Sequence, residues 1–129
     1  MIQGSCLCGN VKYSITGQPG AIVHCHCLTC RKAHGAAFSS VSAVLDENFH
    51  LLSDGGLKSF ESSPGKRRFF CPECGTQIYA KRDNTPHIIL RLGSLDDDPE
   101  VAEEKHIWVS QKAPWYNINN NLPEYDEFE

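Results

Sequence analysis

Phe70-Cys71-Pro72-Glu73-Cys74-Gly75-Thr76 lies between two strand-like segments, residues 66–70 and 77–81. Together they predict a hairpin whose tip carries two thiols. The tip has the form of a zinc knuckle, in which the turn points backbone N–H groups at the first sulfur and Gly75 takes the positive φ angle that follows. Two thiolates cannot close a tetrahedral shell, so this tip needs a second pair of ligands elsewhere in the chain.

Cys6 and Cys8 offer such a pair near the N-terminus. They lie two residues apart, so on a strand they face the same side, as shared ligation requires. The economical arrangement is one structural zinc ion held by Cys6, Cys8, Cys71 and Cys74. This zinc would tie the first hairpin to the middle of the chain across a loop of about 60 residues. Closing so long a loop removes much of the entropy of the unfolded state.

Cys25, Cys27 and Cys30 remain, and they are close enough in sequence to converge on one metal ion. Three thiolates leave one corner of a tetrahedron open, which is the arrangement of a zinc site that binds water or substrate. A histidine could instead fill that corner and make the site structural. His24 and His34 are the plausible fourth ligands, because His26 would point away from the metal if its segment is extended. The spacing leaves both alternatives open.

Three other roles for the cysteines compete with zinc binding. A disulfide framework would leave one of the seven thiols over, and no apolar leader follows Met1. A redox dithiol at Cys71 and Cys74 should sit where a strand enters a helix, whereas a turn and a strand are expected after Cys74. Buried free cysteines would not explain the tight clustering. Cysteines in a chain without an export signal are more often metal ligands or catalytic groups, so zinc is the favoured interpretation.

The size and composition fit one soluble domain spanning residues 1–129. Hydrophobic residues make up 40% of the chain and charged residues 22%, which is ordinary for a globular protein. No apolar stretch approaches membrane-spanning length, so we expect a cytoplasmic protein without a membrane partner. The net charge of −4 argues against nucleic acid, which requires a basic surface. The acidic runs at residues 96–98 and 124–129 are expected to be solvated surface.

The pattern along the chain predicts a mainly β protein with one short helix. Val11, Tyr13 and Ile15 alternate with polar residues, as on a half-buried strand. Residues 28–34 predict about two helical turns that Gly35 ends, and Asp54-Gly55-Gly56 is the clearest turn. Further strands are expected at 21–23, 38–45, 49–52, 57–60, 66–70, 77–81, 88–92 and 107–109, and the stretch beyond Pro114 should be largely irregular.

A zinc ion on three thiolates would carry a net charge of −1, which weakens it as a Lewis acid. Binding a fourth sulfur is the natural use of such a site, because zinc lowers the pKa of a bound thiol and holds its thiolate for carbon–sulfur chemistry. Arg31 and Lys32 follow Cys30 directly. They are candidates to hold a substrate carboxylate, although both can equally be surface cations.

Three ordered motifs carry a family resemblance: Gly4-Ser5-Cys6-Leu7-Cys8-Gly9, Cys25-His26-Cys27 with Cys30-Arg31-Lys32, and Phe70-Cys71-Pro72 with Cys74-Gly75-Thr76. They resemble the glutathione-dependent formaldehyde-activating enzyme family, which includes centromere protein V domains. The similarity continues through His106-Ile107-Trp108-Val109 and ends near Glu124.

The resemblance implies a β-tent fold with two zinc ions per chain. One would be a structural zinc on Cys6, Cys8, Cys71 and Cys74, and the other a catalytic zinc on Cys25, Cys27 and Cys30. It also implies a carbon–sulfur lyase whose partners are a small thiol such as glutathione and an aldehyde such as formaldehyde. The alternative function is a non-catalytic zinc module that binds a protein partner.

Overall fold

The computed structural model describes residues 1–128. It contains ten strands, one α-helix and three short 3-10 helices in this part of the chain. The strands are β1 Ile2–Ser5, β2 Val11–Ile15, β3 Ile22–Cys25, β4 Ser39–Leu45, β5 Phe49–Asp54, β6 Lys58–Ser63, β7 Lys66–Phe70, β8 Gln77–Arg82, β9 His87–Arg91 and β10 Glu103–Ile107. The helix is α1 Leu28–His34, and the 3-10 helices are η1 Asp46–Asn48, η2 Leu92–Ser94 and η3 Val109–Gln111.

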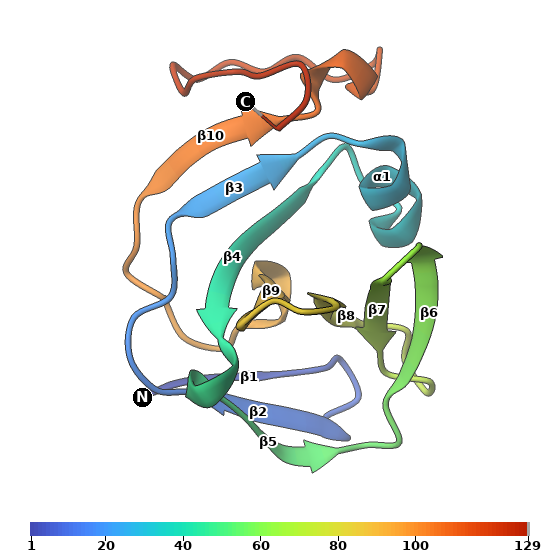
Figure 1. The fold of residues 1–129 in the computed structure, drawn as a ribbon, viewed down its shortest axis with the longest axis vertical. Coiled ribbons are helices and arrows are strands. Elements are labelled where there is room, and N and C mark those ends of the chain that lie inside the picture. Colours follow the sequence, from blue (N-terminus) through green and yellow to red (C-terminus); the bar gives the residue numbers. More distant parts are fainter. Residues whose placement is uncertain (129) are drawn as a thin grey trace.

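Two sheets form the body of the molecule (Figure 1). The smaller sheet has the order β1-β2-β5, and the larger has the order β10-β3-β4-β9-β8-β7-β6. All neighbouring strands are antiparallel except β10 and β3, which run parallel. This architecture confirms the mainly β, β-tent class expected from the sequence.

The main core lies between the two sheets and explains the alternation seen in β2. Val11, Tyr13 and Ile15 point inward and are almost fully buried, with Ile78 and Leu90 from the larger sheet in the same cluster. A Cβ atom on Gly4 would come within 2.2 Å of the Tyr13 ring. Glycine at this position is therefore what allows β1 to lie directly against the aromatic side chain.

Helix α1 begins and ends as the sequence predicted. Cys27 is its N-cap, and its Sγ accepts a hydrogen bond from the Cys30 backbone N–H. Gly35 ends the helix in the left-handed conformation, with φ of 58°, which costs glycine nothing. In Figure 1 the helix lies between the end of β3 and the start of β4 and faces β6 and β7. The second cysteine cluster therefore lies between the β10–β3 edge and the β7–β6 edge of the larger sheet.

The last predicted strand was wrong in its position. The expected strand at residues 107–109 is replaced by β10, which ends at Ile107, and Trp108 adopts a left-handed conformation with φ of 57°. Backbone hydrogen bonds from Trp108 and Val109 to Glu127 and Tyr125 hold the chain in this turn. The strand begins with charged residues, so apolar alternation did not reveal it.

The placement of the first cysteine pair is also corrected. Cys6 and Cys8 lie in the turn between β1 and β2, because β1 ends at Ser5. The acidic run at residues 96–98 is exposed, as expected, and Asp96 and Asp97 also accept hydrogen bonds from the Ser5 hydroxyl and the Gln3 backbone N–H. Among residues 1–128, no helix is long and apolar enough to span a membrane.

Candidate metal centres and the adjoining cavity

The first metal centre joins the turns of two hairpins that are far apart in sequence. Cys6 and Cys8 come from the β1–β2 turn, and Cys71 and Cys74 come from the β7–β8 turn. The Leu7 backbone N–H donates to Thr76 Oγ1 at 3.0 Å, which joins the two turns directly. All four sulfur atoms lie within 4.8 Å of one another, so the four-ligand set predicted from spacing is brought together.

The sulfur spacing in this cluster suits a tetrahedral zinc ion. Zinc–sulfur bonds of about 2.3 Å place tetrahedral sulfurs about 3.8 Å apart. The Cys6 and Cys8 sulfurs lie 3.6 Å apart, and those of Cys8 and Cys71 lie 3.7 Å apart. All seven cysteines are free thiols. The donor set and its spacing therefore fit zinc.

Hydrogen bonds already favour the thiolate form at parts of this cluster. Hydrogen bonds from the Thr76 side chain and backbone lower the pKa of Cys74 to about 5. The pKa of Cys8 is raised to about 12: the Asn10 backbone lowers it, but desolvation and the neighbouring thiols together raise it further. Metal binding requires deprotonated sulfur, so loading this site would release protons.

The second cluster gathers three sulfurs around the start of α1. Cys25 is the last residue of β3, Cys27 caps the helix, and Cys30 lies in its first turn. Their sulfur atoms also lie within 4.8 Å of one another. Cys25 and Cys30 are buried, whereas Cys27 is partly exposed. The short spacing thus makes one side of a metal site from a strand end and a helix start.

Hydrogen bonds, together with nearby positive charge, stabilise a thiolate at Cys30. Hydrogen bonds from Cys25 and Cys27 hold its pKa far below the usual range, and the Arg91 charge acts in the same direction. The Arg68 guanidinium places Nη1 and Nη2 each 3.7 Å from Cys30 Sγ. Hydrogen bonding to Cys27 and Cys30 raises the pKa of Cys25, so this thiol keeps its proton.

The nearby histidines turn away from the cysteine cluster. Alternation along the extended segment puts His24 and His26 opposite Cys25 and Cys27. His24 contacts Ser40 Oγ through Nδ1 and Glu103 through Nε2. His26 Nε2 lies 2.8 Å from His106 Nδ1. In the described part of the chain no histidine joins the three-sulfur group.

His24, His26 and His106 pack together as a buried group, and nothing in the sequence indicated this role for His106. The His106 Nε2 atom lies 3.1 Å from Asn120 Oδ1, and an amide oxygen only accepts. His106 is therefore protonated at Nε2, and its Nδ1 accepts from His26. Burial lowers the pKa of His26 to about 4, so the ring is neutral at pH 7.

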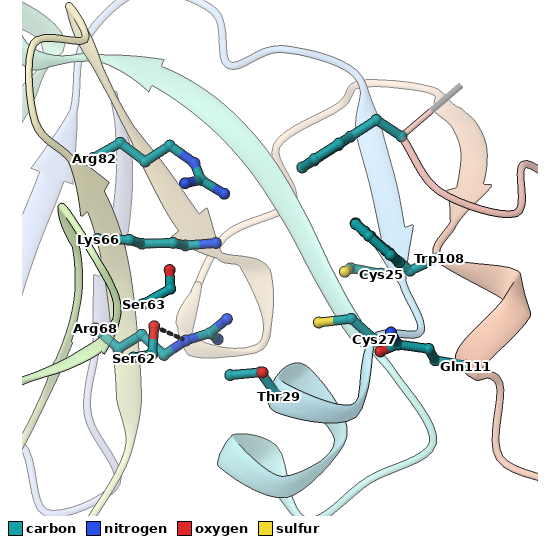
Figure 2. Close-up of a pocket in the computed structure, with 11 residues that line it drawn as sticks. Cys25, Cys27, Thr29, Ser62, Ser63, Lys66, Arg68, Arg82, Trp108 and Gln111 are labelled. Atoms are coloured by element: carbon teal, nitrogen blue, oxygen red, sulfur yellow. Dashed lines mark hydrogen bonds between the residues drawn. The ribbon is translucent and has the colours of Figure 1, made fainter.

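A cavity of about 250 Å³ opens beside the three-sulfur cluster. Figure 2 shows Cys25, Cys27 and Trp108 on one wall, with Lys66, Arg68 and Arg82 on the wall opposite. Lys66 and Arg82 are register partners on β7 and β8, so their side chains leave the same face of the sheet. The cavity therefore combines two of the three sulfurs with a wall of cations.

The cation wall has no carboxylate counterpart in the described residues. Ion pairs in residues 1–128 join His24 to Glu103, Lys81 to Asp46 and Lys105 to Glu104. In the sequence, the Lys66-Arg67-Arg68 run beside Phe69 and Phe70 forms a small basic and aromatic patch, which alternation on a strand explains more simply than nucleic-acid binding. The alternation on this strand was the signal that could have revealed the cation wall, because it separates exposed Arg67 from buried Arg68.

Arg31, the cation expected beside the second cluster, does not line this cavity. Its Nη1 donates to the Gln111 backbone carbonyl at 2.9 Å. The Gln111 side chain in turn accepts from the Leu28 backbone N–H at 2.8 Å. Arg31 thus ties α1 to η3, while the exposed Lys32 lies one residue further along the helix.

Comparisons with known proteins agree with these features. Over 120 residues the chain is 27% identical to an uncharacterized lyase of Schizosaccharomyces pombe, covering 92% of this chain and 85% of that protein. A crystal structure of a Rhodobacter sphaeroides protein shares the fold with a TM-score of 0.62 and 19% identity, covering 78% of this chain and 98% of the other. The family model for the glutathione-dependent formaldehyde-activating enzyme matches residues 1–111. With this match and both cysteine clusters in place, the chain belongs to the glutathione-dependent formaldehyde-activating enzyme family.

Proposed function

We propose that the protein is a zinc-dependent carbon–sulfur lyase acting on the adduct of a small thiol and an aldehyde. Family membership and the relative named as a lyase support a lyase-type role. The observation that carries the proposal is a cluster of three sulfurs that opens onto a cavity and includes no fourth protein ligand in the described residues. The alternative zinc module would be favoured by a fourth protein ligand.

Cys25, Cys27 and Cys30 would hold the zinc ion of this site. A zinc ion with an open corner supplies a position at which a thiol sulfur is kept deprotonated. Zinc with three thiolates has a net charge of −1, and Arg68 and Arg91 beside Cys30 offset it. This balance stabilises the cluster in a largely buried place.

The proposed reaction conserves atoms and charge. In the synthetic direction the thiol sulfur bonds to the aldehyde carbon, and the carbon–oxygen π pair moves to oxygen. The thiol loses its proton and the oxygen gains one, so an S-hydroxyalkyl adduct forms. The lyase direction breaks the same carbon–sulfur bond and returns the thiol and the aldehyde.

Metal content gives the first test. We expect two zinc ions per chain, one for each cluster, with the Cys25 site releasing its zinc first because three ligands hold less tightly than four. Elemental analysis during stepwise chelation, combined with mass spectrometry of alkylated cysteines, measures both quantities. A single zinc per chain with freely alkylated Cys25, Cys27 and Cys30 would contradict the second site.

We propose that Lys66 and Arg82, rather than Arg31, hold an anionic group of the thiol. Both line the cavity opposite Cys25 and Cys27 (Figure 2) and have no carboxylate partner in residues 1–128. A carboxylate placed between them would make charge-assisted hydrogen bonds. The thiol sulfur of the same molecule would then reach the metal cluster across the cavity.

Removing either cation should weaken the binding of mercaptoacetate but not of neutral 2-mercaptoethanol. Charge-assisted hydrogen bonds contribute about 1.5–3 kcal/mol, so Lys66→Met or Arg82→Met should raise the Kd about tenfold or more. Thiol ligation can be followed by thiolate absorption in the cobalt-substituted protein. Arg67→Met is the matched control, because Arg67 is exposed and bonds to Ser59. Equal losses for both thiols would show that the cations act on the metal cluster alone.

The affinity for a carboxylate should also depend on pH through Lys66. Burial, followed by the charges of Arg68, Arg91 and Arg82, lowers its pKa to about 8, against the opposing effect of the Cys30 thiolate. The ammonium charge is present below that value and lost above it. Succinate carries carboxylates but no thiol. Its ability to compete with mercaptoacetate for this site should therefore weaken between pH 7 and pH 9. Lys66→Arg keeps its charge and should show a flat profile; the same pH dependence in this variant would assign the titration to another group.

A further inference from the structure

A second hollow lies next to the cavity, between α1 and the β6–β7 hairpin. Its volume is about 460 Å³. It shares Thr29, Ser62 and Arg68 with the cavity beside the three-sulfur cluster, so the two hollows are direct neighbours. We call this second hollow the apolar groove, because Leu28, Ala33, Phe60 and Phe70 supply much of its wall.

The wall changes from charge to apolar surface along one face of β7. Lys66, Arg68 and Phe70 lie two residues apart and share that face, whereas Phe69 on the opposite face stacks on Tyr79 at 4.4 Å. Phe60 is the register partner of Arg68 on β6. A molecule lying along this face would contact Lys66 at one end and the rings of Phe60 and Phe70 at the other. Arg68, which contacts Cys30 Sγ, lies between them.

The apolar groove leaves hydrophobic side chains open to solvent. Phe60 is 66% exposed and Leu28 is 47% exposed. A one-carbon aldehyde and a polar thiol would leave this surface uncovered. A substrate with an apolar substituent would cover it and gain binding energy from the area removed from water.

We propose that the substrate thiol is amphiphilic, with an anionic group at Lys66 and Arg82 and an alkyl or aryl substituent in the apolar groove. This inference rests on the proposed function, since it places the thiol sulfur between the two ends. The substituent branches from the carbon that carries the sulfur, so that it passes Thr29 and Arg68 toward Phe60. Phe60 and Leu28 thereby select the substrate without touching its reacting atoms.

A series of 2-mercaptoalkanoates tests the proposal, because thiol and carboxylate keep their spacing while the alkyl chain grows. Binding is measured by calorimetry on the zinc-loaded protein and by thiolate absorption in the cobalt-substituted protein. Each fully buried methylene group raises affinity about fourfold, and each methylene that is half buried in an open groove raises it about twofold. We therefore expect affinity to rise at least about tenfold from mercaptoacetate to 2-mercaptooctanoate, with one molecule bound per chain.

The variants Phe60→Ser and Leu28→Ser should flatten this dependence and leave mercaptoacetate binding unchanged. Leu52→Ser is the matched control, since Leu52 is 61% exposed on β5 and is not part of the apolar groove. It should retain the full chain-length dependence.

The possible outcomes distinguish failure of the amphiphilic-thiol inference from failure of the lyase proposal. If mercaptoacetate changes the cobalt spectrum and longer chains bind no more tightly, the inference is overturned and the lyase proposal stands. The inference is also overturned if chain length matters equally in Phe60→Ser, or if the wild type forms a dimer that this variant dissociates. If no thiol changes the spectrum, the lyase proposal itself fails.

Discussion

Cys74→Ser should leave the protein unfolded or insoluble, with a loss of more than about 3 kcal/mol in the free energy of unfolding. Metal binding to a structural zinc site contributes directly to folding, because the unfolded chain has no preformed site. Cys8 and Cys71, two of the other ligands, are 63 residues apart, and their cluster joins turns from both sheets. Cys6 and Cys71 also belong to the main core. Losing one ligand therefore disturbs the junction between the sheets.

The measurement is urea unfolding followed by circular dichroism, with solubility and metal content recorded on the same preparations. Cys27→Ser is the control, because it removes a ligand from a cluster whose cysteines span only one strand end and one helix turn. It should remain soluble and cooperative in unfolding. Equal destabilisation of the two variants would show that the four-cysteine cluster has no special structural role.

Much of the fold was predictable because its turns carry strong local signals. The hairpin at Cys71–Cys74, the turn at Gly55 and the end of α1 at Gly35 depend on residues that favour turns or left-handed backbone. The grouping of the cysteines followed from counting ligands, and the structure brings together both predicted sets. The position of β10 could not be read in the same way, because Glu103, Glu104 and Lys105 replace apolar alternation there.

The walls of the site could not be predicted because they depend on the pairing of strands distant from the cysteines. Nothing in the sequence places β7 opposite α1, yet that arrangement brings Arg68 to Cys30. Lys66 faces the cavity only because β7 pairs with β8 in the observed register. Arg31, adjacent to Cys30 in sequence, instead donates to Gln111. Closeness in sequence therefore predicted which cysteines share a metal site, but it did not predict which cations line the cavity.

The second large effect concerns activity and again uses Cys27→Ser. Cys27 is the partly exposed member of the three-sulfur cluster and lines the cavity. Without it, two sulfurs remain and the second metal should be lost. Metal ions supply several kcal/mol of stabilisation in reactions of this kind. We therefore expect the rate of S-hydroxymethyl adduct formation, with glutathione or mercaptoacetate, to fall about 1000-fold.

Exchange NMR on the thiol–formaldehyde equilibrium gives this rate, and elemental analysis gives the metal content of the same sample. Thr29→Ser is the control, because Thr29 lines the same cavity and the substitution keeps the hydroxyl. It should retain both metals and a rate within a few-fold of the wild type. If Cys27→Ser loses one metal and keeps the wild-type rate, the chemistry does not take place at this cluster. If the wild type accelerates no adduct while its second metal is tightly held, the zinc-module function replaces the lyase. Both clusters would then have structural roles, one joining the two sheets and the other joining a strand end to the start of α1.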